Sequence, residues 1–209
     1  MTYFRDLELI DYHNGPLSAQ YWQCPLLAIG WLEAGRPVSK GSCAIHVVEK
    51  LVELRHQFAE AFPNYSFRGL HACTLCVDDE VGLQGSHINL FIPGEDAVYL
   101  ATGRVDHYIE VHGYAPPPQV IAAILNCPDP RSAQYAVAML RLNRGERPPL
   151  FPERWRIFKV DANRVRMTVR IYEMESEAEA RKFADMLASR DQSHEYDVER
   201  VADPWVAAD

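Results

Sequence analysis

Two cysteines and two histidines constrain this chain more than any other feature. Cys73 and Cys76 lie in the segment HACTLC, and His107 and His112 follow in the segment HYIEVH. Two thiols at this spacing can reach one ion from a single tight turn. Two imidazoles can complete a tetrahedral shell of the ligand types that Zn²⁺ prefers. We therefore predict a zinc site at these four residues that clips two distant parts of the chain together.

The spacing of the two histidines sets a geometric condition on this site. Five residues along an ideal helix turn through about 500°, which leaves two side chains roughly 140° apart. His107 and His112 therefore converge only if the last helical turn loosens before Gly113. His71 is the substitute ligand if one of them fails.

Three other interpretations of the pair remain open. Cys73 and Cys76 can be small core residues, with His112 a buried core histidine. A redox pair is the second alternative, but such pairs normally open a helix that lowers the thiol pKa, and acidic residues follow Cys76 here. In the third, three protein ligands leave a position for water, with Glu110 or Asp106 as a base. Four protein ligands would instead make a closed structural site.

The charge balance narrows the class of partner. The 209 residues include 21 Lys and Arg against 29 Asp and Glu, for a formal charge of −8. Because phosphate contacts need a basic surface, this excess argues against binding to nucleic acid or anionic membranes. The local exception is an arginine strip, which we interpret as a solvent face balanced by the glutamates at 173, 175 and 177. The alternative is a site for phosphate or an acidic partner. The strip comprises Arg164, Arg166 and Arg170, with Arg154 and Arg156 on the neighbouring strand.

Cysteine usage and the N-terminal sequence predict a cytoplasmic protein. The five cysteines are odd in number and scattered, unlike a secreted disulfide framework. The N-terminus carries no secretory signal, and no apolar run approaches the ~20 residues that span a bilayer.

Hydrophobic periodicity predicts an α+β fold. A buried strand is expected at 26–32, and a hairpin has Ile88, Leu90 and Ile92 on one face. Asp129 and Pro130 are expected to cap the last helix of this part. The predicted helices span 44–62, 103–112, 118–125 and about 130–141.

The composition changes after this part of the chain. Residues 143–152 contain three prolines and a glycine and predict a linker or a stiff crossing segment. A ββαβ module follows, with strands expected at 155–160, 165–171 and 196–201. Ser176 and Glu179 form a capping box for its helix, which runs to about Ser189. We therefore expect a zinc-clipped domain over 1–145 and a small module over 153–209.

Four motifs in the first part resemble a family of uncharacterised bacterial proteins. Its pattern is approximately YFxDL…GWLxxGxP…HxCxxC…YHYxxxHGYxPP, and the resemblance covers about residues 1–127. The family is a domain of unknown function, so the resemblance implies no activity. It does imply that His71 and the four predicted ligands belong to one recurring pattern. Asp106 departs from the pattern, which has an aromatic residue there.

The sequence thus favours a non-enzymatic zinc protein that acts through a protein-interaction surface and has no catalytic residue. One concrete form is an immunity or inhibitor protein that neutralises a basic toxin. The alternative is a zinc-dependent hydrolase with an open metal site. Nucleotide-binding loops of the common types are absent from the sequence.

Overall fold

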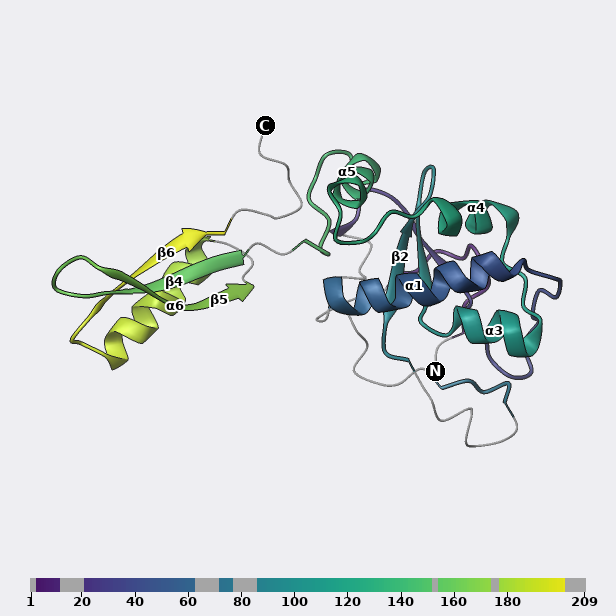
Figure 1. Ribbon diagram of the computed structural model, residues 1–209, viewed down its shortest axis with the longest axis horizontal. Coiled ribbons are helices and arrows are strands. Elements are labelled where there is room, and N and C mark those ends of the chain that lie inside the picture. Colours follow the sequence, from purple (N-terminus) through teal and green to yellow (C-terminus); the bar gives the residue numbers. More distant parts are fainter. Residues whose placement is uncertain are drawn as a thin grey trace. The chain divides into compact units, whose positions relative to one another are not determined.

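The computed structural model describes residues 3–11, 21–62, 72–76, 86–151, 154–173 and 177–201. Contacts divide the chain into two compact units, Met1–Leu150 and Phe151–Asp209. The described residues form five helices and two three-stranded sheets, so the predicted α+β class is confirmed (Figure 1). No helix among these residues is both long enough and apolar enough to cross a membrane. Whether each unit is an independent folding domain stays a prediction.

The N-terminal unit is built on a sheet of order β1-β3-β2. The predicted hairpin is present, because β2 (Asn89–Pro93) pairs antiparallel with β3 (Val98–Thr102). On its other side β3 pairs in parallel with β1 (Leu26–Ile29), which ends earlier than the predicted strand. Residues 7–10 line the remaining edge of β1, where the Leu7 N–H donates to the Ala28 carbonyl at 2.8 Å. Strand pairing therefore joins segments that are far apart in the sequence.

Both side-chain rows of β2 are buried, unlike a strand with one solvent face. Leu90 and Ile92 are buried as predicted, but Asn89 and Phe91 on the other row are buried too. The ring of Trp22 stacks on Phe91 at a centroid distance of 6.0 Å. Helices α1 (Ile45–Ala61), α4 (Pro118–Asn126) and α5 (Ala133–Leu142) all contact β2. Because β2 is covered on both faces, most residues of both its side-chain rows are apolar.

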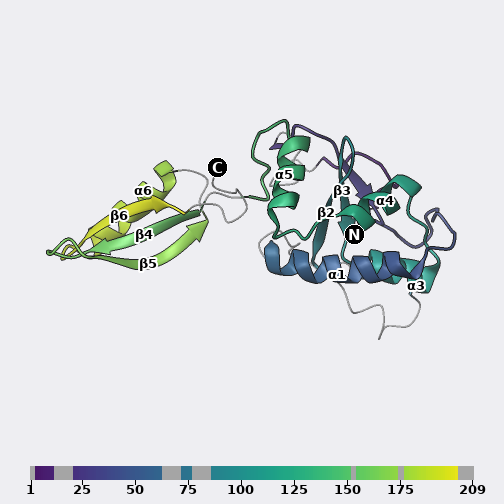
Figure 2. The same cartoon turned by 45° about the horizontal axis from the view of Figure 1, so that its top comes forward.

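The helices begin and end close to the predicted residues, with one exception. The periodic stripe of α1 is buried, and Pro118 opens α4 at its first turn. Both helices are labelled in Figure 2. The prediction that Asp129 caps the next helix is wrong, because Ser132 is the N-cap of α5 and its Oγ accepts the Tyr135 N–H at 3.2 Å. The Asp129 carboxylate instead accepts the Arg131 N–H at 2.8 Å, in a turn that precedes the helix.

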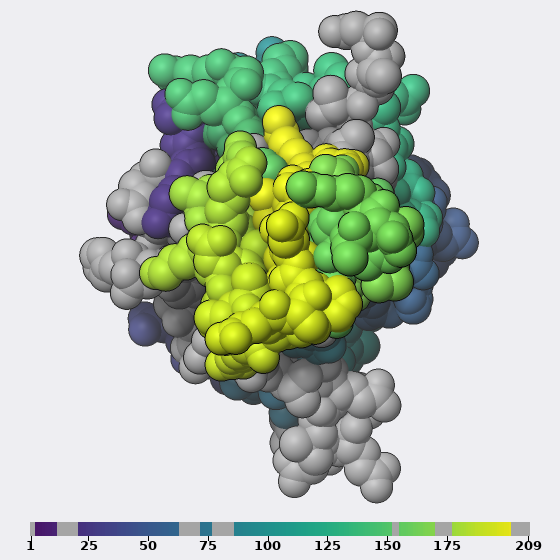
Figure 3. Space-filling model, turned by 90° about the vertical axis from the view of Figure 1, so that its left-hand side faces the viewer, coloured from purple at the N-terminus to yellow at the C-terminus, as the bar shows by residue number. Residues whose placement is uncertain are grey.

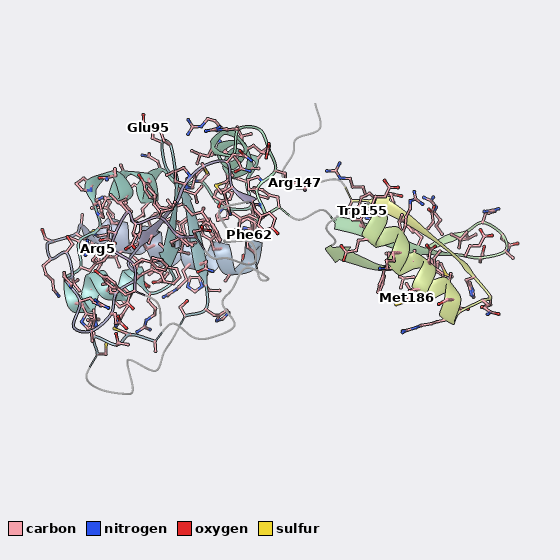
Figure 4. The ribbon with its side chains drawn as sticks, turned by 180° about the vertical axis from the view of Figure 1, so that it is seen from behind. Arg5, Phe62, Glu95, Arg147, Trp155 and Met186 are labelled. Atoms are coloured by element: carbon pink, nitrogen blue, oxygen red, sulfur yellow. The ribbon has the colours of Figure 1, made fainter. Side chains whose placement is uncertain are left out.

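The segment predicted as a linker packs onto the N-terminal unit as far as Leu150. The Asn143 side chain is 1% exposed and accepts the Gln23 N–H at 2.7 Å, while its Nδ2 donates to the Glu146 carbonyl at 3.0 Å. Leu150 is also buried. Residues 143–150 therefore form a packed segment that is stiffened by prolines, one of the two forms expected from the composition. Arg147 of this segment is labelled in Figure 4.

The C-terminal unit is the predicted ββαβ module. Its central strand β4 (Arg154–Val160) pairs antiparallel with β5 (Arg166–Glu173) and with β6 (Glu195–Arg200). Helix α6 (Glu177–Arg190) packs against this sheet. In Figure 4 the label Trp155 marks the start of β4 and the label Met186 marks α6. The capping residue expected at Ser176 lies outside the described residues. The small core consists of Trp155, Ile157, Ala180, Ala184 and Val198.

Two arginines of the strip, Arg164 and Arg166, are exposed and paired with acids, whereas the side chains of Arg154 and Arg170 lie outside the described part of the structure. Arg166 forms ion pairs with Asp197 and Glu199 of β6, and Arg164 pairs with Glu195 at 3.1 Å. These partners reach across β4 and are not the glutamates that the sequence suggested. Figure 3 views the unit from the end that carries the β4–β5 turn (green) and the α6–β6 turn (yellow).

Candidate metal centre

The two histidines lie on helix α3 (Val105–His112), whose last turn is widened. Gly113 follows in the left-handed conformation with φ 60°, and it ends the helix as predicted. The Tyr108 carbonyl accepts the backbone N–H groups of both Gly113 and Tyr114, at spacings of five and six residues instead of four. This is the loosening that convergence of His107 and His112 requires. Their ring centroids lie 5.1 Å apart.

The two cysteines flank a tight turn in the described segment 72–76. The Thr74 side chain within this turn accepts the Ala34 N–H at 2.9 Å, which ties the turn to the loop after β1. Cys73 is buried, whereas Cys76 is partly exposed. The turn therefore presents both thiols from one short segment that is anchored elsewhere in the unit.

The four predicted ligands form one cluster. Their ligand atoms all lie within 4.8 Å of one another. The Nε2 of His112 lies 3.2 Å from the Cys73 sulfur and 3.3 Å from the Cys76 sulfur, and the Nε2 of His107 lies 3.3 Å from the Cys76 sulfur. Zn–S and Zn–N bonds at tetrahedral angles imply an S···N separation of about 3.5 Å. The donor types and their separations therefore fit a tetrahedral ion of this size.

Burial and nearby cations keep the two imidazoles neutral. The pKa of His107 is lowered to about 4, first by burial and then by the positive charges of Arg104 and His112. The pKa of His112 is lowered by burial, Lys40 and Arg104. A metal binds the neutral imidazole, so the surroundings select the ligand form of both side chains at neutral pH.

Tyr108 lies between the two histidines in the sequence and is fully buried. Its hydroxyl is hydrogen-bonded to the Cys73 side chain, and burial together with the charge of Cys73 raises the pKa of the phenol. The phenol therefore stays protonated and acts as the donor. Its ring also lies beside those of His107 and His112, at centroid distances of 5.7 Å and 6.2 Å.

Contacts from other elements hold α3 near both ends. At its start, Asp106 forms an ion pair with Arg55 of α1 at 2.8 Å, and the two helices lie side by side (Figures 1 and 2). At its end, the Lys40 ammonium donates to the His112 carbonyl. The Tyr114 hydroxyl donates to Asp6 at 2.8 Å. These contacts fix the direction of the helix that carries both imidazoles.

Sequence reasoning identified the four clustered residues but missed the roles of the residues that surround them. Arg55 and Lys40 appear in no motif, because their partners lie more than 50 positions away. Tyr108 belongs to the family pattern, but the pattern gave it no role, because its partner Cys73 lies 35 positions away. The two residues considered as bases for an open site differ in burial. Asp106 is buried in its ion pair, whereas Glu110 is exposed. His71, the substitute ligand, lies outside the described residues.

Comparison with known proteins places the N-terminal part in a family. The family model described as "Domain of unknown function (DUF7919)" matches residues 2–125, more than half of the chain. No curated protein and no solved structure matches the chain. The matched region includes α1, the cysteine turn and all of α3, so the candidate metal centre lies inside it. The chain belongs to the DUF7919 family.

Proposed function

We propose that Cys73, Cys76, His107 and His112 bind one Zn²⁺ as a closed structural site. The observation that carries this proposal is the convergence of four donors, two sulfur and two Nε2 atoms, within 4.8 Å. Four protein ligands complete the tetrahedral shell of zinc and leave no position for water. In this role the ion joins the cysteine turn to α3, and the binding free energy contributes directly to folding.

Elemental analysis and X-ray absorption test this proposal. Protein purified without a metal-affinity tag should contain about one zinc per chain. The absorption spectrum should show two sulfur ligands at about 2.3 Å and two nitrogen ligands at about 2.0 Å. Cys43→Ser is the matched control, because Cys43 is a partly exposed cysteine outside the cluster. Protein that takes up no zinc, or a shell without sulfur, would contradict the proposal.

The same spectrum separates the structural site from a zinc-dependent hydrolase. A hydrolase needs a water-derived oxygen in the shell and a base beside it. Asp106 is a poor base here because Arg55 holds its carboxylate at 2.8 Å. A shell with three protein ligands and one oxygen would favour the hydrolase over the structural role.

We infer further that the protein is cytoplasmic and acts by binding another protein. The formal charge of −8 supports a partner with a basic face, such as a toxin that this protein would neutralise. The test is binding of the purified zinc-loaded protein to the product of the adjacent gene, measured by calorimetry at two salt concentrations. Salt-sensitive binding would support a basic partner, and absence of binding would contradict the immunity role.

A further inference from the structure

The cluster has an internal asymmetry that the ligand set alone does not reveal. Cys73 is 5% exposed and hydrogen-bonded to the buried Tyr108, whereas Cys76 is partly exposed at the other end of the turn. The two thiolates of one site therefore differ in both solvent access and hydrogen bonding.

A phenol in this position can act only as a donor toward the thiolate. A metal-bound thiolate carries no proton, so the proton of the hydrogen bond must come from the Tyr108 hydroxyl. Tyr108 is 0% exposed, so water does not compete for this bond. The Tyr108 backbone also takes part, because its carbonyl accepts the N–H groups of Gly113 and Tyr114 that close the widened turn.

We propose that Tyr108 is a positioning residue of the metal centre that orients the Cys73 thiolate and lowers its reactivity through the hydroxyl hydrogen bond. This inference rests on the proposed zinc site. Groups that hydrogen-bond to metal ligands orient them and tune the metal, and their loss commonly weakens metal binding by 10- to 100-fold. Withdrawal of electron density from the sulfur also makes that thiolate less nucleophilic than one without such a donor.

Tyr108→Phe tests the hydroxyl while retaining the buried ring. Tyr135→Phe is a matched control, because Tyr135 is also 0% exposed and its hydroxyl donates to the Phe91 carbonyl at 2.7 Å, away from the cluster. Both variants lose one buried hydroxyl and one hydrogen bond. We expect chelator competition to show zinc bound about tenfold more weakly in Tyr108→Phe, and unchanged in Tyr135→Phe.

Cobalt substitution supplies a readout that a purely structural role would not change. In Co²⁺-loaded protein, loss of the hydrogen bond should raise the energy of the sulfur electrons and move the thiolate-to-cobalt charge-transfer band to longer wavelength. The band should shift in Tyr108→Phe and stay in place in Tyr135→Phe. Equal zinc affinity and an identical band in both variants and the wild type would overturn the proposal.

If Tyr108→Phe fails to fold, a tyrosine analogue whose hydroxyl is a stronger hydrogen-bond donor supplies a second test. A fluorinated tyrosine at position 108 retains the ring and strengthens the donor, so the charge-transfer band should move to shorter wavelength. An unchanged band would overturn the role of the hydroxyl. Wild-type protein that binds neither zinc nor cobalt would instead refute the metal site itself, so the two failures are distinguishable.

Discussion

The two units of this chain differ in how much of their sheets is buried and in what else stabilises them. In the N-terminal unit, β2 and β3 are covered so fully that even Asn89 and Thr102 are buried. The same unit also contains the cluster of four potential metal ligands, which brings the cysteine turn next to α3. In the C-terminal unit, five buried residues form the core. Met167 and Val169 of its edge strand β5, and Val165 just before that strand, are between 45% and 54% exposed.

This difference indicates which interactions stabilise each unit. A unit of about 60 residues is small for a core that folds without a disulfide or a metal, since little of its surface can be buried. The C-terminal unit has exposed ion pairs, which contribute little individually. The N-terminal unit combines a larger core with a candidate metal centre. We expect substitutions to act on the two units separately and by very different amounts.

The largest effect is expected from Cys73→Ser. Binding of a structural zinc contributes on the order of 10 kcal/mol, which equals or exceeds the whole stability of an ordinary domain. The N-terminal unit should therefore lose its fold, measured by thermal unfolding and by the spread of amide signals in NMR spectra. Cys43→Ser should keep both its zinc and its fold. An unchanged melting temperature for Cys73→Ser would mean that the cluster is not a structural metal site.

Acidification is expected to have the next largest effect. An unfolded chain protonates His107 near pH 6.5, whereas the folded chain does so only near pH 4, because burial lowers the pKa. The unfolded state therefore binds more protons between these values, and stability falls as the pH falls from about 6.5 to about 4.

Protonation of the thiols adds to this loss by releasing zinc. Melting temperatures measured from pH 7.5 to 4.5 should fall, and excess zinc should move the midpoint of that loss to lower pH by mass action. A midpoint that does not respond to zinc would contradict metal binding by these groups.

Ile157→Ala should destabilise the C-terminal unit by about 3 kcal/mol, because it leaves a cavity in a small core where Ile157 is 0% exposed. Val169→Ala is the control at a position that is 45% exposed, where the change should stay within about 0.5 kcal/mol. Denaturant unfolding and zinc content should be measured together. Loss of zinc in Ile157→Ala would show that the two units form one cooperative structure.

Asp106→Asn should cost about 2 kcal/mol, since it leaves the Arg55 guanidinium without the carboxylate that binds it between α1 and α3. Glu60→Gln is the matched control: Glu60 lies on α1, as Arg55 does, and pairs with Arg131, but both side chains of this pair are well exposed. Urea unfolding compares the two. Equal changes in the free energy of unfolding would show that the ion pair between Arg55 and Asp106 does not hold α3 against α1.

The smallest effect is expected from Arg166→Ala. Arg166 pairs with Asp197 and Glu199, but all three side chains are exposed, so water and salt screen the attraction. The free energy of unfolding should change by about 0.5 kcal/mol or less, and the difference should shrink in high salt. A change of several kcal/mol would show that the ion-pair face, and not the small core, stabilises this unit.

Much of the local structure could be predicted from particular residues. The repeat of apolar residues in α1, Pro118 at the start of α4 and Gly113 after α3 predicted these helices, because each acts through neighbours in the chain. The four clustered residues were predictable for a similar reason. Thiol and imidazole pairs at short spacings are rare enough to indicate zinc chemistry, and here their donors lie in one cluster.

The differences between prediction and structure have separate causes. Asp129 has the chemistry of a helix cap, but Arg131 engages its carboxylate and Ser132 caps α5 instead, so the competing residues are close in the chain. Residues 143–150 have the composition of a linker or a stiff crossing segment, and Asn143 accepts a hydrogen bond from the backbone of Gln23, 120 positions away. Local composition left that choice open, and a distant partner decided it.

The sequence by itself determined the secondary structure and the donors of the metal centre, because propensity, capping and ligand chemistry depend on residues that are close in the chain. The tertiary structure alone decided the parallel pairing of β1 with β3 and the coverage of both faces of β2. It also placed the Tyr108 hydroxyl on Cys73 and the Arg55 guanidinium on Asp106. These contacts join residues 35 to 72 positions apart, and no local pattern specifies a partner at such distances.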